Sequence, residues 1–192
     1  MITDCITNYI EINLSYKRKH HIYGVKDTAI RLARFYHEDE NKAELAALFH
    51  DMFRGASEQT LNDYVKEFGL ADKYLNNKNL AHGKIAACVM KRDYAIQDEE
   101  LLNAVSFHTT GRAGMSTLEK IIYLADAIEP NRSYPGVDEL RKLAFQNLDD
   151  ACILSLSRTI DFVKSRGLFL DEDTVKAKDD LIKNKENMNE QQ

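Results

Sequence analysis

Apolar residues recur at intervals of three and four positions along almost the whole chain, which is the pattern of amphipathic helices. No segment shows the strict alternation that is typical of a β-strand. The chain has only two prolines and eight glycines to interrupt helices. The pattern predicts helices near 4–15, 22–37, 42–50, 57–68, 83–93, 98–108, 117–129, 136–146, 149–166 and 173–184. We therefore expect an all-α helical bundle.

Local signals at the helix ends support this prediction. Asn41 with Glu44, and Ser116 with Glu119, have the spacing of a capping box at a helix start. Gly167 is placed to end the ninth helix. At 192 residues the chain is long enough for one domain with a sizeable core, which we place at residues 1–182. Residues 183–192 form a polar tail that we expect to fray.

The cysteines and the apolar runs indicate a cytoplasmic protein. Cys5, Cys88 and Cys152 are odd in number and contain no Cys-x-x-Cys pair, so we expect reduced thiols in the core. No run approaches the ~18 apolar residues that a membrane span needs, and the first residues lack the features of a signal peptide. We therefore expect no membrane association.

The net charge of −5 argues against nucleic acid as a partner, because proteins that bind it usually carry a basic face. A small polyphosphate remains compatible with this charge. Metal cations and a few arginines can neutralise such a substrate locally, whatever the sign of the whole surface.

Asp126 is the residue that first points to chemistry. It lies in the apolar run 121–128, where a helix would bury it, and a buried carboxylate without a positive partner costs several kcal/mol. The nearest basic residues, Lys120 and Arg132, are not three or four positions away, where a helix would bring them alongside. A metal ion is therefore the expected partner.

Five further residues extend this candidate metal site. His21 falls at the start of a predicted helix, His50 and Asp51 at the end of another, His82 just before a third and His108 at the end of a fourth. Side chains at helix ends can converge in one cleft. Imidazole and carboxylate ligands suit iron, manganese, zinc or nickel, and the lack of nearby thiolates argues against a structural zinc site. The number of ligands fits two ions that share a carboxylate.

Taken singly, each histidine has a simpler explanation. A lone histidine is more often a surface or satisfied core residue than a ligand, and we assign His20 and His37 that way. His50 could also interact favourably with a helix dipole at its carboxyl end. Only the combined pattern indicates a metal centre.

The order of these ligands resembles that of the HD-domain metal-dependent phosphohydrolases. Residues 18–25, 80–83, 108–112 and 126–132 resemble the YqeK group within them, which consists of bacterial symmetrical diadenosine tetraphosphatases. The resemblance implies an all-α HD-domain bundle, possible homodimers, and hydrolysis of a dinucleoside polyphosphate, with diadenosine tetraphosphate and water giving two ADP. The group usually has a lysine where this chain has Arg54, which keeps the charge and can contact phosphate through two hydrogen bonds.

The resemblance also implies roles for individual residues. The tighter ion would be held by His21, His50, Asp51 and Asp126, and a second by Asp51 with His82 and His108, unless these two histidines face the phosphates instead. We expect iron first, then manganese or another transition metal. An ion of this kind lowers the pKa of water and polarises a phosphoryl oxygen. The expected catalytic residues are Asp51, Arg54, His82, His108 and Arg132.

The nucleotide-binding set implied by the resemblance is wider. It consists of His21, Asp51, Met52, Phe53, Arg54, His82, His108, Thr109, Asp126, Arg132, Leu168, Phe169, Leu170, Asp171, Glu172 and Asp173. Phe169 could stack on adenine, or it could pack the last helix onto the core. Two alternatives to the activity stay open. The chain could hydrolyse another nucleotide, such as a nucleoside monophosphate, a cyclic nucleotide or a guanosine alarmone, or it could bind nucleotides without turnover.

Overall fold

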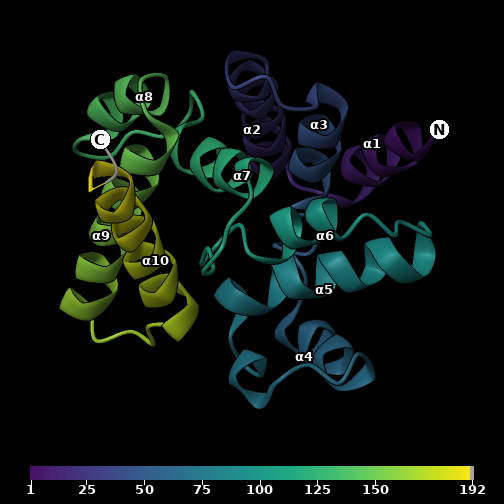
Figure 1. Cartoon of the computed structure of the whole chain (residues 1–192). Coiled ribbons are helices and arrows are strands. Elements are labelled where there is room, and N and C mark those ends of the chain that lie inside the picture. The colour runs from purple at the N-terminus through teal and green to yellow at the C-terminus, as the bar shows by residue number, and fades with distance from the viewer. Residues whose placement is uncertain (191–192) are drawn as a thin grey trace.

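Ten α-helices follow one another in residues 1–190, the part of the chain that the structure, a computed structural model, describes (Figure 1). They are α1 (Ile2–Asn13), α2 (Tyr16–Phe35), α3 (Glu40–Phe49), α4 (Glu58–Glu67), α5 (Lys78–Asp93), α6 (Glu99–Ser106), α7 (Thr117–Ile128), α8 (Val137–Ala144), α9 (Leu148–Ser165) and α10 (Glu172–Asn189). A single 3-10 turn, Asp72–Tyr74, precedes α5. The predicted all-α fold is confirmed.

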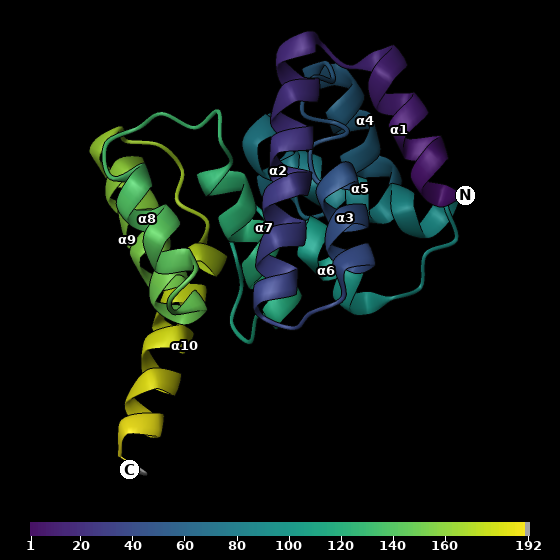
Figure 2. The same cartoon turned by 90° about the horizontal axis from the view of Figure 1, so that it is seen from above.

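Helix α7 lies between two groups of helices. It packs against α2, α3 and α6 on one side and against α8 and α9 on the other. Figure 2 shows α8, α9 and α10 gathered beside α7, apart from α1 to α6. The carboxyl ends of α3, α6 and α7 therefore meet residues of α2 and α5 near the middle of the molecule, which is where the candidate site lies.

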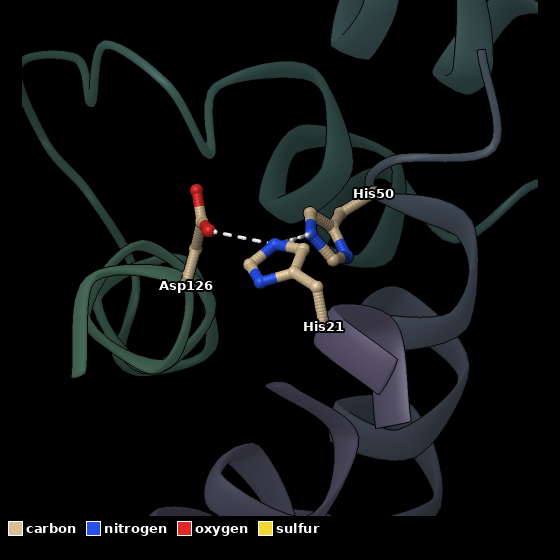
Figure 3. A group of neighbouring side chains, drawn as sticks. All are labelled: His21, His50 and Asp126. Carbon is tan, nitrogen blue, oxygen red and sulfur yellow. Dashed lines mark hydrogen bonds and ion pairs between the residues drawn. The ribbon is translucent and has the colours of Figure 1, made fainter. Parts of the chain in front are cut away.

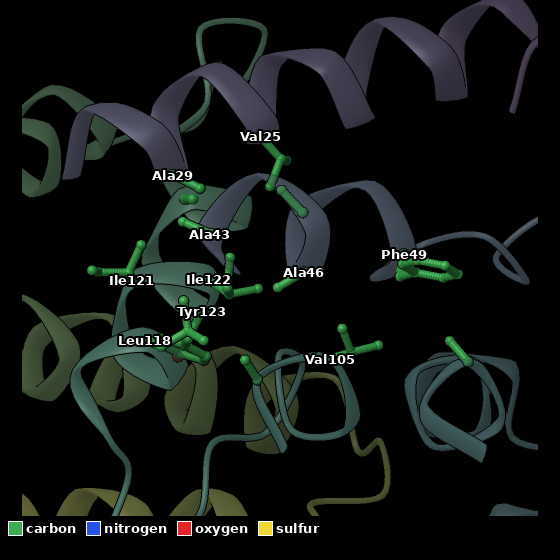
Figure 4. Close-up of a cluster of buried hydrophobic side chains, with 14 of the residues drawn as sticks. Val25, Ala29, Ala43, Ala46, Phe49, Val105, Leu118, Ile121, Ile122 and Tyr123 are labelled. Atoms are coloured by element: carbon green, nitrogen blue, oxygen red, sulfur yellow. The ribbon is translucent and has the colours of Figure 1, made fainter. Parts of the chain in front are cut away.

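Small and branched apolar residues hold α2, α3 and α7 together (Figure 4). Ala29 of α2 and Ala43 of α3 are fully buried and let these two helices approach closely, while Ile121 and Ile122 of α7 fill the space beside them. Each such isoleucine contributes roughly 1.5–3 kcal/mol by its burial. This packing fixes the relative positions of the helices that carry the polar residues of the site.

Two helices, α2 and α5, begin five or more residues earlier than predicted. The side chain of Ser15 caps α2 and that of Asn77 caps α5, so the helices start at residues 16 and 78 and not near 22 and 83. His21 and His82 therefore lie inside their helices, where we had expected them at or just before the first turn. Both caps lack the acidic residue three positions on that makes a capping box easy to recognise.

Of the three other predicted helix ends, the structure confirms two and contradicts one. Asp39 caps α3 by accepting a hydrogen bond from the main-chain N–H of Asn41 at 2.8 Å, so the predicted capping box starting at Asn41 is wrong. The box formed by Ser116 and Glu119 is confirmed, with hydrogen bonds of 3.2 and 2.8 Å. Gly167 follows α9 with φ +61°, as a left-handed helix stop requires.

The three cysteines differ in burial, although we predicted that all of them would lie in the core. Only Cys152 is buried, Cys88 is half-buried, and Cys5 is exposed on α1, so the expectation of three core thiols is wrong for Cys5. All three are free thiols.

The end of the chain is more helical than the sequence pattern indicated. Helix α10 continues to Asn189, through most of the stretch that we expected to fray from residue 183. The last part of that stretch, residues 191–192, lies outside the described residues. Within residues 1–190, no helix has the length and apolar character needed to cross a membrane.

Candidate metal centre

Six polar side chains from five parts of the chain meet at the middle of the molecule. They are His21 in the second turn of α2, His50 and Asp51 directly after α3, His82 in α5, His108 two residues beyond α6, and Asp126 in the last turn of α7. One group consists of His21, His50 and Asp126 (Figure 3). Each of these residues offers one ligand atom, and the three atoms lie within 4.8 Å of one another. A second group of the same size consists of His50, Asp51 and His108. The structure thus brings together every residue that the sequence suggested as a metal ligand.

The carboxylate of Asp51 lies between two pairs of histidines. Its Oδ2 is 3.4 Å from Nε2 of His21 and 3.6 Å from Nε2 of His50. Its Oδ1 is 3.1 Å from Nε2 of His82 and 4.0 Å from Nε2 of His108. One carboxylate with an oxygen directed at each histidine pair is the arrangement that two neighbouring ions would share.

All four histidines direct Nε2 into the centre because Nδ1 has a partner elsewhere. His50, His82 and His108 each donate Nδ1–H to a main-chain carbonyl three or four residues earlier, at 2.6, 2.9 and 2.8 Å. His21 donates Nδ1–H to Oε1 of the buried Glu129 at 3.1 Å. These contacts fix the tautomer and the ring orientation, as outer contacts do for metal-binding histidines.

The protonation of the centre suits cation binding. Burial lowers the pKa of His108 to about 3 and also lowers that of His50, so both rings are neutral and offer a lone pair. Burial would raise the pKa of Asp126, but the contact with Nε2 of His21 at 3.1 Å and the guanidinium of Arg132 hold that pKa well below its usual range. Neutral imidazoles with ionised carboxylates are the donor set that divalent transition metals prefer, so the residues present fit such an ion.

One expectation about Asp126 is wrong. Its side chain is 24% exposed, and Arg132 does reach it, pairing with the carboxylate and donating from Nε to the main-chain oxygen of Asp126 at 2.8 Å. The reason is a turn after α7, closed by a hydrogen bond from the N–H of Arg132 to the carbonyl of Glu129 at 2.9 Å. The chain doubles back, so a residue six positions away contacts Asp126. Arg18 likewise pairs with Asp51.

A cavity of about 320 Å³ opens onto the centre. Its walls include both carboxylates, His82, His108 and three arginines, Arg18, Arg54 and Arg132. Arg54 is held by a hydrogen bond to Oδ1 of Asn79, which also lines the cavity, at 2.7 Å. We call this space the central cavity. A cavity with three guanidinium groups beside a carboxylate and imidazole cluster fits a phosphate chain.

A second cavity, of about 280 Å³, adjoins the first. It shares Asn79 and Thr109 with the central cavity and is otherwise walled in part by residues 168–171 and Thr174. We call it the loop cavity. The nucleotide-binding prediction placed Leu168, Phe169, Leu170 and Asp171 in one segment, and all four line this space.

Four members of the predicted nucleotide-binding set lie elsewhere. Met52 and Phe53 are 3% and 7% exposed and pack in the core, because the turn after α3 directs them inward. Glu172 is exposed and pairs with Lys176 at 2.8 Å, and neither Glu172 nor Asp173 lines the loop cavity. The structure does not bring these four side chains to the centre.

Sequence reasoning missed three polar residues at the centre. Arg18, Asn79 and Glu129 each lie three positions from a predicted ligand, namely His21, His82 and Asp126. Residues three apart share a face of a helix, so this spacing was a signal that could have identified them.

Comparison with known proteins matches the chain to one family. Residues 18–131 match the HD domain. The symmetrical bis(5'-nucleosyl)-tetraphosphatase of Bacillus subtilis is 40% identical over 158 residues, covering 82% of this chain and 85% of its own, and the protein of that name from Halalkalibacterium halodurans is 39% identical, covering 90% and 93%. A crystal structure from Clostridium acetobutylicum, of a protein described as an HD-superfamily hydrolase involved in NAD metabolism, has a TM-score of 0.89 and 45% identity, covering 94% and 97%.

Proposed function

Since this chain belongs to the HD-domain family, we propose that it is a metal-dependent hydrolase that cleaves diadenosine tetraphosphate symmetrically into two ADP. The observation that carries the proposal is the position of Asp51 between two histidine pairs, at the floor of a cavity with three arginines. The relatives named symmetrical tetraphosphatases match over most of their own length, which supports the same reaction here.

We propose that His21, His50, Asp51 and Asp126 hold one divalent ion, and that Asp51, His82 and His108 hold a second. Iron is the first candidate and manganese the next, since imidazole and carboxylate ligands accept both. A bound ion would acidify water and withdraw electron density from a phosphoryl oxygen. The neutral imidazoles and the two carboxylates described above are the residues of this chain that support such binding.

The arginines of the central cavity would act on the phosphate chain. Arg18, Arg54 and Arg132 line the cavity, and their charge would offset the charge that gathers on phosphate oxygens as the bond breaks. Asn79 holds Arg54 in place, so the guanidinium does not need to be ordered when substrate binds. Arg54 therefore retains the function that a lysine would have at this position and adds a fixed geometry.

One nucleoside would occupy the loop cavity. Phe169 is 60% exposed and lines it, so its ring is available for an adenine base and is not needed to pack α10. Thr109 lies at the border with the central cavity, and its Oγ1 is 3.2 Å from Nε2 of His108. A ribose or the first phosphate would pass this threonine.

The cell compartment and assembly state belong to the proposal as well. Three free cysteines favour a reducing compartment, which supports action in the cytoplasm on a small nucleotide. A homodimer is the assembly we expect from the family.

A substrate panel tests the function. The protein, purified without chelator and supplied with Fe(II) or Mn(II), is given diadenosine tetraphosphate, deoxyadenosine monophosphate, cyclic AMP and a guanosine alarmone, and kcat/KM is compared. We expect the highest value for diadenosine tetraphosphate. A higher value for another nucleotide would assign the chain to a different phosphohydrolase activity, and tight ADP binding without turnover of any substrate would indicate a binding module.

A further inference from the structure

We propose that a third cavity, walled by Tyr16, His20, Asn131, Ser133 and Tyr134 among others, binds the second adenosine of the substrate. We call it the tyrosine groove. This inference rests on the proposed function, because it concerns the half of diadenosine tetraphosphate that the loop cavity does not hold. It assigns a binding role to residues of α2 and of the segment after α7 that the sequence did not single out.

The tyrosine groove adjoins the central cavity. It shares Arg18 and Arg132 with the central cavity, whereas the loop cavity shares Asn79 and Thr109 with it. The central cavity thus borders one neighbour at the two arginines and the other at the asparagine and the threonine. At about 650 Å³, the tyrosine groove is the larger of these two neighbours.

Symmetric cleavage requires a binding space for a nucleoside on each side of the bond that breaks. Water adds to one of the two central phosphorus atoms, the bridging P–O bond breaks, and the bridging oxygen leaves with the other ADP. Each product carries an adenosine and two phosphates, so nucleosides extend from the reacting bond in both directions. With one nucleoside in the loop cavity, the other must extend from the centre in another direction, and the tyrosine groove adjoins the centre at Arg18 and Arg132.

The phosphates that lead to the second adenosine would lie between basic side chains. Arg18 and Arg132 stand at the border, and Lys17 also lines the tyrosine groove. Guanidinium groups bind phosphate oxygens through paired hydrogen bonds. The border is therefore suited to the two phosphates that connect the reacting bond to the second adenosine.

The aromatic side chains of the tyrosine groove suit a purine base. Among the tyrosines, all of which lie in the described part of the chain, Tyr16 and Tyr134 are the two most exposed, at 78% and 37%, and both line this groove. Exposed aromatic rings stack on bases with little preference among them. Two exposed tyrosines on one groove beside a phosphate-binding cavity are better explained by a base than by chance exposure.

Both tyrosines are held in place by hydrogen bonds. The hydroxyl of Tyr16 is 2.7 Å from Nε2 of His20, and the two ring centroids are 4.6 Å apart. The hydroxyl of Tyr134 donates to the carbonyl of Ala127 at 2.8 Å. Ring positions that are fixed before binding reduce the entropy lost when a base stacks on them.

The test compares two substrates that differ only in the second adenosine. Diadenosine tetraphosphate carries it, and adenosine 5'-tetraphosphate lacks it and would be cut to ADP and pyrophosphate. For Tyr16→Ala and Tyr134→Ala, we expect KM for diadenosine tetraphosphate to rise about tenfold, while KM for adenosine 5'-tetraphosphate changes less than about twofold. Tyr16→Phe and Tyr134→Phe keep the ring and should retain most of the affinity.

Phe35→Ala is the matched control, because Phe35 is also an exposed aromatic residue on α2 but does not line the groove. We expect it to leave both KM values unchanged. Equal effects of the tyrosine variants on both substrates, or no effect on either, would overturn the inference. Failure of the unaltered protein to hydrolyse diadenosine tetraphosphate would instead overturn the proposed function, so the two failures are distinguishable.

Discussion

Nε2 of His82 lies 3.1 Å from Oδ1 of Asp51, on the side of the carboxylate that faces away from His21. The two oxygens of one side chain thus serve two sets of imidazoles. This relationship makes Asp51 the residue on which both proposed ion positions depend.

Replacing Asp51 with asparagine should therefore affect both ions together. The amide keeps the shape of the side chain but removes the charge, so we expect Asp51→Asn to lose bound metal and at least about a hundredfold in kcat. Metal content by mass spectrometry and helicity by circular dichroism provide the measurement. Asp63→Asn, at an exposed aspartate on α4, is the control and should behave like the unaltered protein. Full activity in a metal-free Asp51→Asn protein would refute the metal centre.

Replacing His82 should affect one ion position only. His82→Ala leaves His21, His50 and Asp126 in place, so we expect about one ion per chain to remain where the unaltered protein binds two. A calorimetric titration with Mn(II) gives the number of ion sites per chain. If His82→Ala binds as many ions as the unaltered protein yet turns over slowly, His82 contacts the substrate phosphates and not an ion.

Glu129 should tune the affinity for metal without touching the ion. It accepts a hydrogen bond from Nδ1 of His21 and is 2% exposed, so Glu129→Gln weakens the acceptor that orients this ring. We expect metal affinity to fall about tenfold with little change in helicity. Glu119→Gln is a matched control, because Glu119 is an equally buried glutamate of α7 that pairs with Arg112 at 2.6 Å.

We expect the Glu119→Gln control to change stability and not metal affinity. Glu119→Gln should lower the free energy of unfolding by about 2 kcal/mol and leave metal affinity unchanged, since the buried carboxylate that pairs with Arg112 loses its charge. Thermal unfolding and metal titration separate the two effects. A Glu129→Gln protein that loses stability but binds metal normally would contradict the positioning role of Glu129.

Gly83 should be required because of His108. A Cβ on Gly83 would lie 2.9 Å from the His108 ring and 2.9 Å from the carbonyl of Val105, closer than packed atoms approach. Alanine normally stabilises a helix relative to glycine, yet we expect Gly83→Ala to lower kcat about tenfold or more by displacing His108. Gly55→Ala, where nothing lies within 4 Å, should have no effect. If Gly83→Ala has unchanged kcat and KM, the His108 ring can shift without loss of activity, and the prediction is wrong.

The sequence predicted the helices, and it also indicated which histidines and aspartates would meet at the centre, because both depend on local or repeated patterns. The 3.6-residue periodicity located all ten helices of the described chain, and the spacing of histidines and aspartates indicated the centre. It did not locate the starts of α2 and α5, because the caps formed by Ser15 and Asn77 have no partner that marks them.

Contacts that depend on how the chain turns could not be predicted. The pairing of Arg132 with Asp126 requires the turn after α7, which brings together residues six positions apart. Met52 was grouped with its neighbour Asp51, although the turn after α3 places one side chain in the core and the other at the centre. The tyrosine groove joins residues of α2 to residues 131–134, and only the packed helices show that these segments meet.

The central claim is symmetric hydrolysis at the Asp51 centre, and hydrolysis in water enriched in oxygen-18 tests it most directly. With diadenosine tetraphosphate, Fe(II) or Mn(II), and mass spectrometry of the products, we expect ADP as the only adenine nucleotide. Half of the ADP molecules should carry one heavy oxygen atom on the terminal phosphate, because water adds to one of the two central phosphorus atoms. Formation of ATP with AMP, or of ADP without the label, would contradict the account.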